Sequence, residues 1–157
     1  MDINQALYES GVRDDTLTSQ EKESLDKDGY LHLRGILTPE RLDAIRTRQQ
    51  ELLDVEGENA GTEVHQERGT DRLSDLINKG EMFHIVLTQP KVLASIAHVL
   101  QNDLKLSSLN SRNALPGQGL QRIGRLSERH GVVSRLDLVS EFQDPERQVR
   151  VFRQRLR

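Results

Sequence analysis

The spacing of apolar and capping residues predicts two helices in the first third of the chain. Thr18 and Glu21 have the spacing of a capping box, in which each side chain binds a backbone N–H at the start of a helix, and this helix extends to about Asp28. Thr38 is followed by a proline and a glutamate, and apolar residues then recur on one face. This pattern predicts a second helix over residues 39–54.

The next segments alternate between polar stretches and apolar periodicity. Residues 1–17 show no sustained period and are expected to be a loose lead-in, and the glycine-rich stretch 55–70 is expected to be a loop. Apolar residues at helical spacing predict a short helix over 71–78 and another from Pro90 to about residue 101. The chain is therefore expected to be rich in helix before residue 102.

Strand signals are fewer and shorter. Residues 30–33 read as a short strand after Gly29, which is suited to end the preceding helix. Residues 104–115 change to a period of two, which predicts a longer strand. Further on, residues 146–156 can be drawn as a basic helix with three apolar side chains on one face, and the sequence leaves open whether this helix forms.

Composition limits the class of protein. The chain has 157 residues, enough for one domain, with 34% hydrophobic and 30% charged residues and neither cysteine nor tryptophan. Without cysteine, disulfide frameworks, thiolate chemistry and cysteine–zinc sites are excluded. No apolar run is long enough to span a membrane, and the first residues lack the pattern of a signal peptide. We expect a cytoplasmic protein that does not bind a membrane.

The net charge of −3 is unevenly distributed. Residues 1–119 hold 13 Lys and Arg against 20 Asp and Glu, whereas residues 120–157 hold nine Arg, no Lys and five acids. A basic segment of this kind suggests an arm that binds an anionic partner or nucleic acid. Aromatic stacking residues and a recognition motif are lacking, which makes nucleic acid the weaker alternative. The arginines concerned are Arg147, Arg150, Arg153, Arg155 and Arg157.

Three segments, in order, resemble the phytanoyl-CoA dioxygenase-like family. Residues 24–33 resemble the acid–glycine–aromatic step that precedes the first strand in this family, and residues 35–42 resemble the helix start that follows it. The helix 90–101 and the strand 104–115 resemble the segment that leads into the catalytic barrel. The resemblance covers residues 18–120.

This resemblance implies an α+β fold, in which an amino-terminal helical layer carries the first strands of an incomplete double-stranded β-helix of the jelly-roll or cupin type. Full-length relatives use Fe(II), O2 and 2-oxoglutarate to hydroxylate small organic substrates, and two histidines and one carboxylate hold the iron. The implied organisation is a lead-in over 1–17, a family-like part over 18–120 and an arginine-rich tail over 121–157. The chain is thus interpreted as a truncated member of the family.

The chain departs from the family where the iron ligands are expected. The His-x-Asp or His-x-Glu should follow Leu120, and other residues stand there. We therefore assign no catalytic residue and no metal ligand, and we expect the chain alone to be inactive and to bind neither Fe(II) nor 2-oxoglutarate. The resemblance places Arg72 near the co-substrate, and Asn110 and Arg112 precede the missing motif and are candidates to line a pocket. The alternative for all three is surface charge or strand capping.

The five histidines show no metal-binding pair at helical spacing. We expect His98, His32 and His84 to be partly buried and hydrogen-bonded, because each lies beside apolar residues, and we expect His65 to be exposed in its polar loop. None of them is predicted to bind a metal.

A frameshift is one hypothesis for the abrupt change after Gln121. If Gln121–Gly124 is encoded CAG CGG ATT GGG, an overlapping frame reads Ala-Asp-Trp, and one base lost from a preceding His codon would replace His-Ala-Asp-Trp by the residues present. Arginine without lysine also agrees with an out-of-frame reading of GC-rich DNA. Sequencing the coding DNA and reading it in all three forward frames tests this hypothesis. A single intact frame shared with relatives would contradict it.

An incomplete barrel has consequences for association. Unpaired strand edges pair readily with other chains, so we expect association through exposed edges, and either poor solubility or a disordered tail after about residue 120. A further alternative is a non-catalytic interaction protein that keeps the helical layer and binds a full-length relative.

Overall fold

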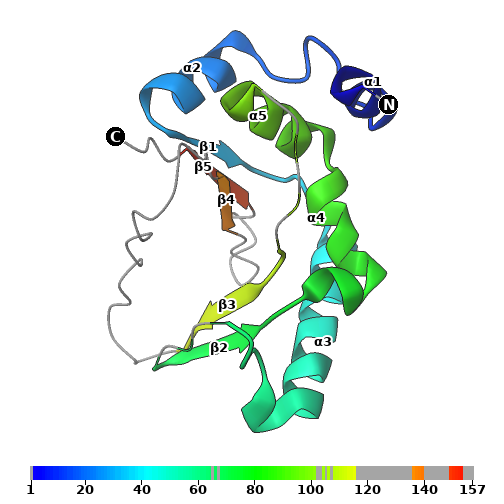
Figure 1. Ribbon diagram of the computed structural model, residues 1–157, viewed down its shortest axis with the longest axis vertical. Coiled ribbons are helices and arrows are strands. Elements are labelled where there is room, and N and C mark those ends of the chain that lie inside the picture. The colour runs from blue at the N-terminus through cyan, green and yellow to red at the C-terminus, as the bar shows by residue number, and fades with distance from the viewer. Residues whose placement is uncertain are drawn as a thin grey trace.

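The computed structural model of the protein is a mixed fold of helices and short antiparallel strands (Figure 1), and it describes residues 2–64, 66, 68–101, 104, 106, 108–115, 136–139 and 149–153. The helices are α1 (Ile3–Glu9), α2 (Ser19–Lys27), α3 (Pro39–Glu56), α4 (His84–Thr88) and α5 (Pro90–Leu100), with 3-10 turns η1 (Gly57–Asn59), η2 (Leu76–Asn78) and η3 (Glu81–Phe83). The strands are β1 (Tyr30–Leu33), β2 (Thr70–Leu73), β3 (Ser111–Ala114), β4 (Leu136–Val139) and β5 (Val149–Arg153).

The described strands form two small sheets. Sheet A has the order β1-β5-β4, with β5 in the centre and both pairings antiparallel. Sheet B consists of β2 and β3, also antiparallel. Helices α2 and α5 lie near β1, whereas α3 runs beside β2 at the other end of the molecule (Figure 1). The α+β class is confirmed, and the double-stranded β-helix stays a prediction.

Local capping signals set the helix boundaries as the sequence predicts. The Thr18 hydroxyl accepts a hydrogen bond from the backbone N–H of Glu21 at 3.1 Å, and the Glu21 carboxylate accepts one from the backbone N–H of Thr18 at 2.8 Å. The Thr38 hydroxyl accepts from the N–H of Arg41 at the start of α3. Gly29 follows α2 with φ +78°, a conformation that glycine adopts without strain.

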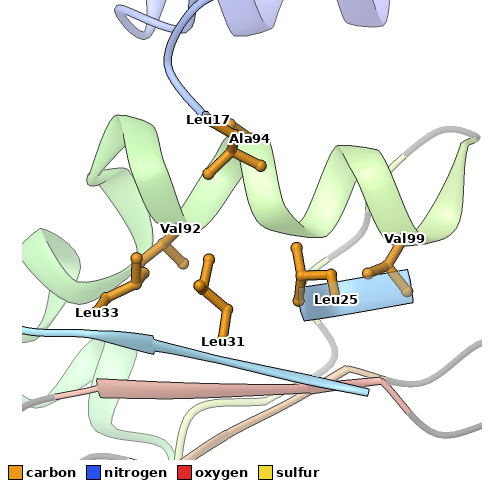
Figure 2. Close-up of a cluster of buried hydrophobic side chains, with 7 residues drawn as sticks. All are labelled: Leu17, Leu25, Leu31, Leu33, Val92, Ala94 and Val99. Carbon is orange, nitrogen blue, oxygen red and sulfur yellow. The ribbon is translucent and has the colours of Figure 1, made fainter. Parts of the chain in front are cut away.

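Two hydrophobic clusters hold the elements together. The first joins α2, β1 and α5 (Figure 2) through Leu17, Leu25, Leu31, Leu33, Val92, Ala94 and Val99. The second joins α3, β2 and the 3-10 turns through Leu37, Leu42, Ile45, Leu52, Leu73, Leu76 and Phe83. The fully buried members, such as Leu25 and Ile45, fix the helices against the strands. Leu42, Ile45 and Leu52 on the predicted face of α3 are buried, and the buried residues of α5 are Val92, Ala94, Ser95 and Val99.

Three expectations about local structure before residue 116 are corrected. The lead-in 1–17 contains α1, and the Arg13 guanidinium after it lies 3.8 Å from the centre of the Tyr8 ring. The predicted helix 71–78 is instead the strand β2 followed by η2. Among the described residues of the predicted strand 104–115, β3 is the part that forms a strand.

The tail also differs from expectation. In place of the possible helix over 146–156, the structure has β5, which pairs with β1. In this segment the β-branched Val149 and Val151 favour a strand, and β1 offers it a hydrogen-bonding partner. A tail disordered throughout after residue 120 is wrong for 136–139 and 149–153, and the rest of the tail lies outside the described residues.

Membrane insertion finds no support in the helices. None of those in the described part of the chain combines the length and the apolar character needed to cross a bilayer.

Candidate functional site

Sheet B brings two of the three candidate residues together. Arg72 lies in β2, and it faces Arg112 of β3 across the antiparallel ladder. Directly opposed residues of an antiparallel pair project to the same face of the sheet. Arg72 is partly buried and Arg112 is exposed. The site therefore contains two guanidinium groups from strands that are distant in sequence.

A polar pocket of about 350 Å³ opens beside Arg72, where the end of α3 and η1 approach β2. Arg72 is the one lining residue with a positive charge, and its Nε atom is buried. A guanidinium in such a position suits a carboxylate or phosphate, which it binds with two parallel hydrogen bonds. The lining residues are Gln50, Leu53, Gly57, Glu58, Ala60, Gln66, Thr70, Asp71 and Arg72.

The pocket wall depends on a close approach between two backbones. Gly61 has φ +65°, and a Cβ added there would lie 2.7 Å from the carbonyl oxygen of Arg72. Glycine is the one residue that meets both conditions, since it has no Cβ and tolerates a left-handed conformation. The loop after η1 can thereby lie against β2.

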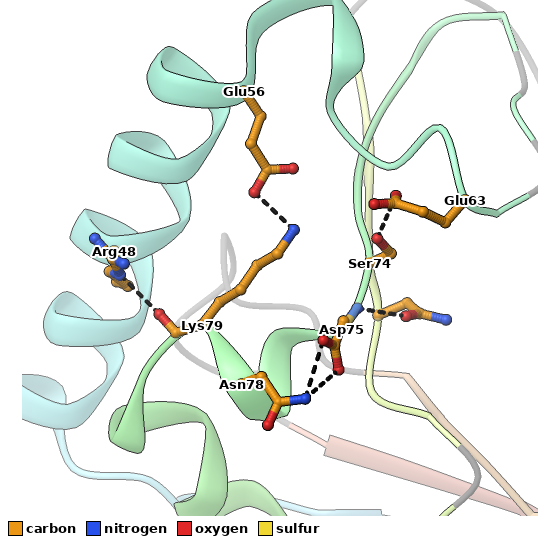
Figure 3. A network of polar contacts seen from close by, with 8 residues as sticks. Arg48, Glu56, Glu63, Ser74, Asp75, Asn78 and Lys79 are labelled. Carbon is orange, nitrogen blue, oxygen red and sulfur yellow. Dashed lines mark hydrogen bonds and ion pairs between the residues drawn. The ribbon is translucent and has the colours of Figure 1, made fainter.

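A carboxylate–hydroxyl bond fastens the same loop to the end of β2. The Ser74 hydroxyl donates to the Glu63 carboxylate at 2.5 Å, and Ser74 is buried (Figure 3). This hydrogen bond lowers the pKa of Glu63 below its ordinary value. Glu63 is therefore a structural anchor and is ionised at neutral pH.

Asn110, the third candidate, holds a turn rather than the pocket. Its side-chain oxygen accepts from the backbone N–H of Asp75 at 3.1 Å, and its amide donates to the Ser108 hydroxyl at 3.4 Å. Asp75 has the left-handed φ of +51°, and its carboxylate accepts two contacts from the Asn78 amide at 2.9 and 3.0 Å (Figure 3). Asn110 thus stabilises the strained turn after β2, as the strand-capping alternative predicts.

The other side of this turn is tied to α3. The Lys79 ammonium lies 2.7 Å from the Glu56 carboxylate, with each side chain about one-fifth exposed at 21% and 20%. Arg48 donates to the Lys79 carbonyl oxygen at 2.9 Å (Figure 3). It also donates to the Glu51 carboxylate at 2.9 Å. These contacts fix the spacing between α3 and sheet B, and so the width of the pocket.

The described histidines lie apart from one another and differ in their hydrogen bonds and in their exposure. His98 is partly buried and pairs with the Asp26 carboxylate at 3.2 Å, as predicted. His84 binds the Ile77 carbonyl at 2.8 Å but is exposed. His32 is partly buried, yet its Nε2 is buried with no hydrogen-bond partner among the described residues, so this part of the expectation is wrong.

One triplet of the metal-binding pattern occurs elsewhere in the sequence. A His-x-Glu triplet does occur, His65-Gln66-Glu67, so the motif is missing at the family position after Leu120 and not from the whole chain. Its histidine and glutamate lie outside the described residues. Within the described ranges, no three His, Cys, Asp or Glu side chains are grouped to hold a metal ion.

The arginine-rich tail is only partly described. Arg150 and Arg153 belong to β5, where Arg150 stands opposite His32 in the register. A continuous basic helix is therefore excluded as the form of the proposed arm. The remaining arginines of this group, Arg147, Arg155 and Arg157, lie outside the described residues.

Comparisons with known proteins returned no relative, since no protein-family model, curated protein or solved structure matches the chain. The resemblance to phytanoyl-CoA dioxygenase-like proteins therefore stays a prediction from the sequence.

Sequence reasoning missed several residues that build the pocket. Gln50 and Glu58 come from the end of α3 and from η1, and Thr70 and Asp71 come from β2. Gly61 carried the one usable signal, because a glycine in a polar loop often marks a left-handed turn or a close backbone approach. The sequence does not show which residue Gly61 approaches, since this depends on the fold.

Proposed function

We propose that this chain is a non-catalytic, carboxylate-binding relative of the phytanoyl-CoA dioxygenase-like proteins. It would correspond to the amino-terminal part of the family domain, with Arg72 as the contact to the co-substrate 2-oxoglutarate. This proposal keeps the expectation that the chain binds no Fe(II) and replaces the expectation that it binds no 2-oxoglutarate. The observation that carries the proposal is the polar pocket of about 350 Å³ beside Arg72. A partly buried guanidinium beside a pocket of this size suits a carboxylate ligand.

The donor set of the described residues does not fit Fe(II). The family site needs two histidines and a carboxylate on one face of the metal. Here His98 and His84 bind Asp26 and the Ile77 carbonyl, and they lie on different helices. Iron chemistry is therefore not part of the proposed role of this chain alone.

The first test is turnover. The purified chain, supplied with Fe(II) and 2-oxoglutarate, should form no succinate above a metal-free control. Iron-dependent succinate formation would overturn the non-catalytic proposal, and the variant His65→Ala would then show whether the His-x-Glu triplet holds the metal.

The second test is binding without iron. Millimolar 2-oxoglutarate should raise the melting temperature of the chain, because a ligand that binds the native state stabilises it by mass action. Arg72→Gln should remove most of this shift. Arg41→Gln is the matched control, since Arg41 is exposed near the start of α3, away from the pocket at the other end of that helix. Equal shifts in both variants would contradict the role of Arg72.

A cytoplasmic location, a small organic substrate for the complete domain and association through strand edges remain parts of this proposal. The interaction alternative rests on β1 and β4, which are the outer strands of sheet A among the described strands. Such edges attract other chains unless something covers them.

A further inference from the structure

Two carboxylates line the pocket beside Arg72 without an ion pair of their own. Glu58 belongs to η1 and is exposed, and Asp71 belongs to β2 and is partly buried. In the part of the chain that the structure describes, neither carboxylate has a hydrogen bond or an ion pair with another side chain. A partly buried carboxylate without a partner is stabilised by a cation or a hydrogen-bond donor that is brought to it. The pocket therefore presents negative charge that a ligand can pair with.

The two glutamines of the lining also present hydrogen-bond acceptors. The Gln66 amide donates to the carbonyl oxygens of Gly61 and Val64. The Gln50 amide donates to the Asp54 carboxylate at 2.9 Å. Because their N–H groups are engaged in this way, both side chains offer the pocket acceptor oxygens more than donors. The polar lining is thus richer in acceptors than in donors.

Arg72 does not reverse this balance. Among the described lining residues it is the one with a positive charge, and two carboxylates stand against it, so the lining has a net negative charge. This balance does not depend on whether the guanidinium is also engaged within the chain. A ligand whose carboxylate lies at Arg72 therefore fits better when it also carries a positive group, since unlike charges attract strongly only at short range.

We propose that the pocket takes small α-amino carboxylates, with the ammonium group bound at Asp71 and Glu58 and the carboxylate at Arg72. An ammonium group has three N–H donors, which suits a lining of carboxylate and amide oxygens. A pocket of about 350 Å³ is large enough for a ligand of this size. The inference rests on the proposed function for the contact at Arg72, and it adds the two carboxylates as the residues that select an ammonium group.

Small ligands of similar size test each half of the site. They are L-alanine, which carries both charged groups, propionate, which lacks the ammonium group, L-lactate, which has a hydroxyl in its place, and ethylamine, which lacks the carboxylate. Chemical-shift titration of the full isotope-labelled chain, without iron and at neutral pH and constant ionic strength, measures the affinities. L-Alanine should bind on the order of tenfold more tightly than propionate or L-lactate, because its ammonium group makes a charge-assisted contact with Asp71.

Neutral side chains of the same shape identify the carboxylates that act. Asp71→Asn should lower the affinity for L-alanine about tenfold and leave that for propionate no weaker. Glu58→Gln should lower the affinity for L-alanine about threefold, because water and salt screen an exposed side chain. Asp43→Asn is the matched control and should behave as wild type, since Asp43 is exposed near the start of α3 and pairs with Arg46.

The melting temperature of each unliganded variant reports folding. If Asp71→Asn does not fold, Glu58→Gln still tests the inference, because it changes an exposed side chain of η1.

Two results would overturn the inference. One is an affinity of the wild type for L-alanine that is no higher than that for propionate or L-lactate. The other is a preference for L-alanine that neither Asp71→Asn nor Glu58→Gln reduces. If propionate binds through Arg72 and the ammonium group adds nothing, the proposed function stands and this inference fails. If L-alanine and ethylamine bind through Asp71 and Arg72→Gln changes neither affinity, the ammonium site stands and the carboxylate contact at Arg72 fails.

Discussion

Gly61 shows how one missing side chain shapes the pocket. Gly61→Ala adds a Cβ 2.7 Å from the Arg72 carbonyl oxygen and forces an alanine into φ +65°. We expect a loss of about 2–4 kcal/mol in the free energy of unfolding, from left-handed strain together with overpacking. Urea denaturation monitored by circular dichroism measures it, and binding at the Arg72 pocket should weaken as well.

Gly35 provides the control at almost the same backbone angle. It has φ +63°, and a Cβ added there would meet no atom within 4 Å. Gly35→Ala should therefore show the conformational strain alone, about 1–2 kcal/mol. If the two alanine variants are equally stable, the close approach of the loop to β2 is not as the structure has it.

Candidate residues that are close in sequence differ in what they contact. Asn110 and Arg112 are two residues apart, yet Asn110 is engaged with the turn at Asp75, whereas Arg112 stands opposite Arg72. The sequence does not distinguish them, because both are polar residues that precede the missing motif. The difference arises from the pairing of β2 with β3, which no local pattern specifies.

The docking of α2 on α5 depends on an ionised carboxylate. Glu21 lies 2.5 Å from the Lys91 ammonium and also binds the backbone N–H of Thr18. Burial raises the pKa of Glu21, but the hydrogen bonds from Lys91 and Thr18 outweigh it, so that the pKa lies below its ordinary value. Folding therefore favours the charged form, and α2 is held more firmly where Glu21 is ionised.

The sign of the pH dependence follows from this lowered pKa. The stabilisation from ionised Glu21 is complete at pH values above its unfolded-state pKa of about 4.3. It is lost as the pH falls through the lower pKa of the folded state. Glu21→Gln should cost about 1 kcal/mol at pH 7. Its deficit relative to wild type should shrink below about pH 4. Urea unfolding at both pH values measures these differences.

Glu23 offers a matched control on the same helix. Its carboxylate pairs with Lys27 on the surface of α2, where the side chains are 57% and 72% exposed. Exposed pairs of this kind contribute little to stability. Glu23→Gln should change the free energy of unfolding by less than about 0.5 kcal/mol at either pH. A pH dependence equal to that of Glu21→Gln would refute the specific role of the contact with α5.

Elements that are set by interactions between residues close in sequence could be predicted, whereas elements that are set by contacts between distant segments could not. The Thr18 and Thr38 caps, the proline at the start of α5 and the alternation in β1 each act within a few residues, and these elements form where expected. The helix expected over 71–78 became β2 because β3 pairs with it. Its apolar residues Leu73 and Leu76 are buried in either structure, which is why periodicity did not distinguish them.

The candidate site likewise depends on contacts between segments that are distant in sequence. Arg72 was found through a family resemblance, and the structure shows that it lines a polar pocket. The pocket itself combines the end of α3, η1 and β2, so it exists only after these elements have packed. Residue type alone gives no signal for such a surface.

At the scale of the whole molecule, β5 links the two ends of the described chain. It lies between β1 and β4, so that the amino-terminal layer of α2, α5 and β1 is completed by a strand from the tail. A frameshifted tail has no evolved reason to fit an existing strand edge. The pairing of Leu31 with Val151 and the frameshift hypothesis therefore make different predictions for exchange.

Amide hydrogen exchange on the full chain decides between them. If β5 is the central strand of sheet A, amides of β1 and β5 should be protected together, and Val151→Pro should remove this protection because proline has no N–H to donate to a central ladder. Exchange in β1 should then accelerate on the order of a hundredfold. Protection in α3 should persist, since Ile45 and Leu52 belong to the other hydrophobic cluster. Val151→Ala keeps the N–H and should retain most protection, whereas unprotected β5 amides in the wild type would show that the tail does not complete the sheet.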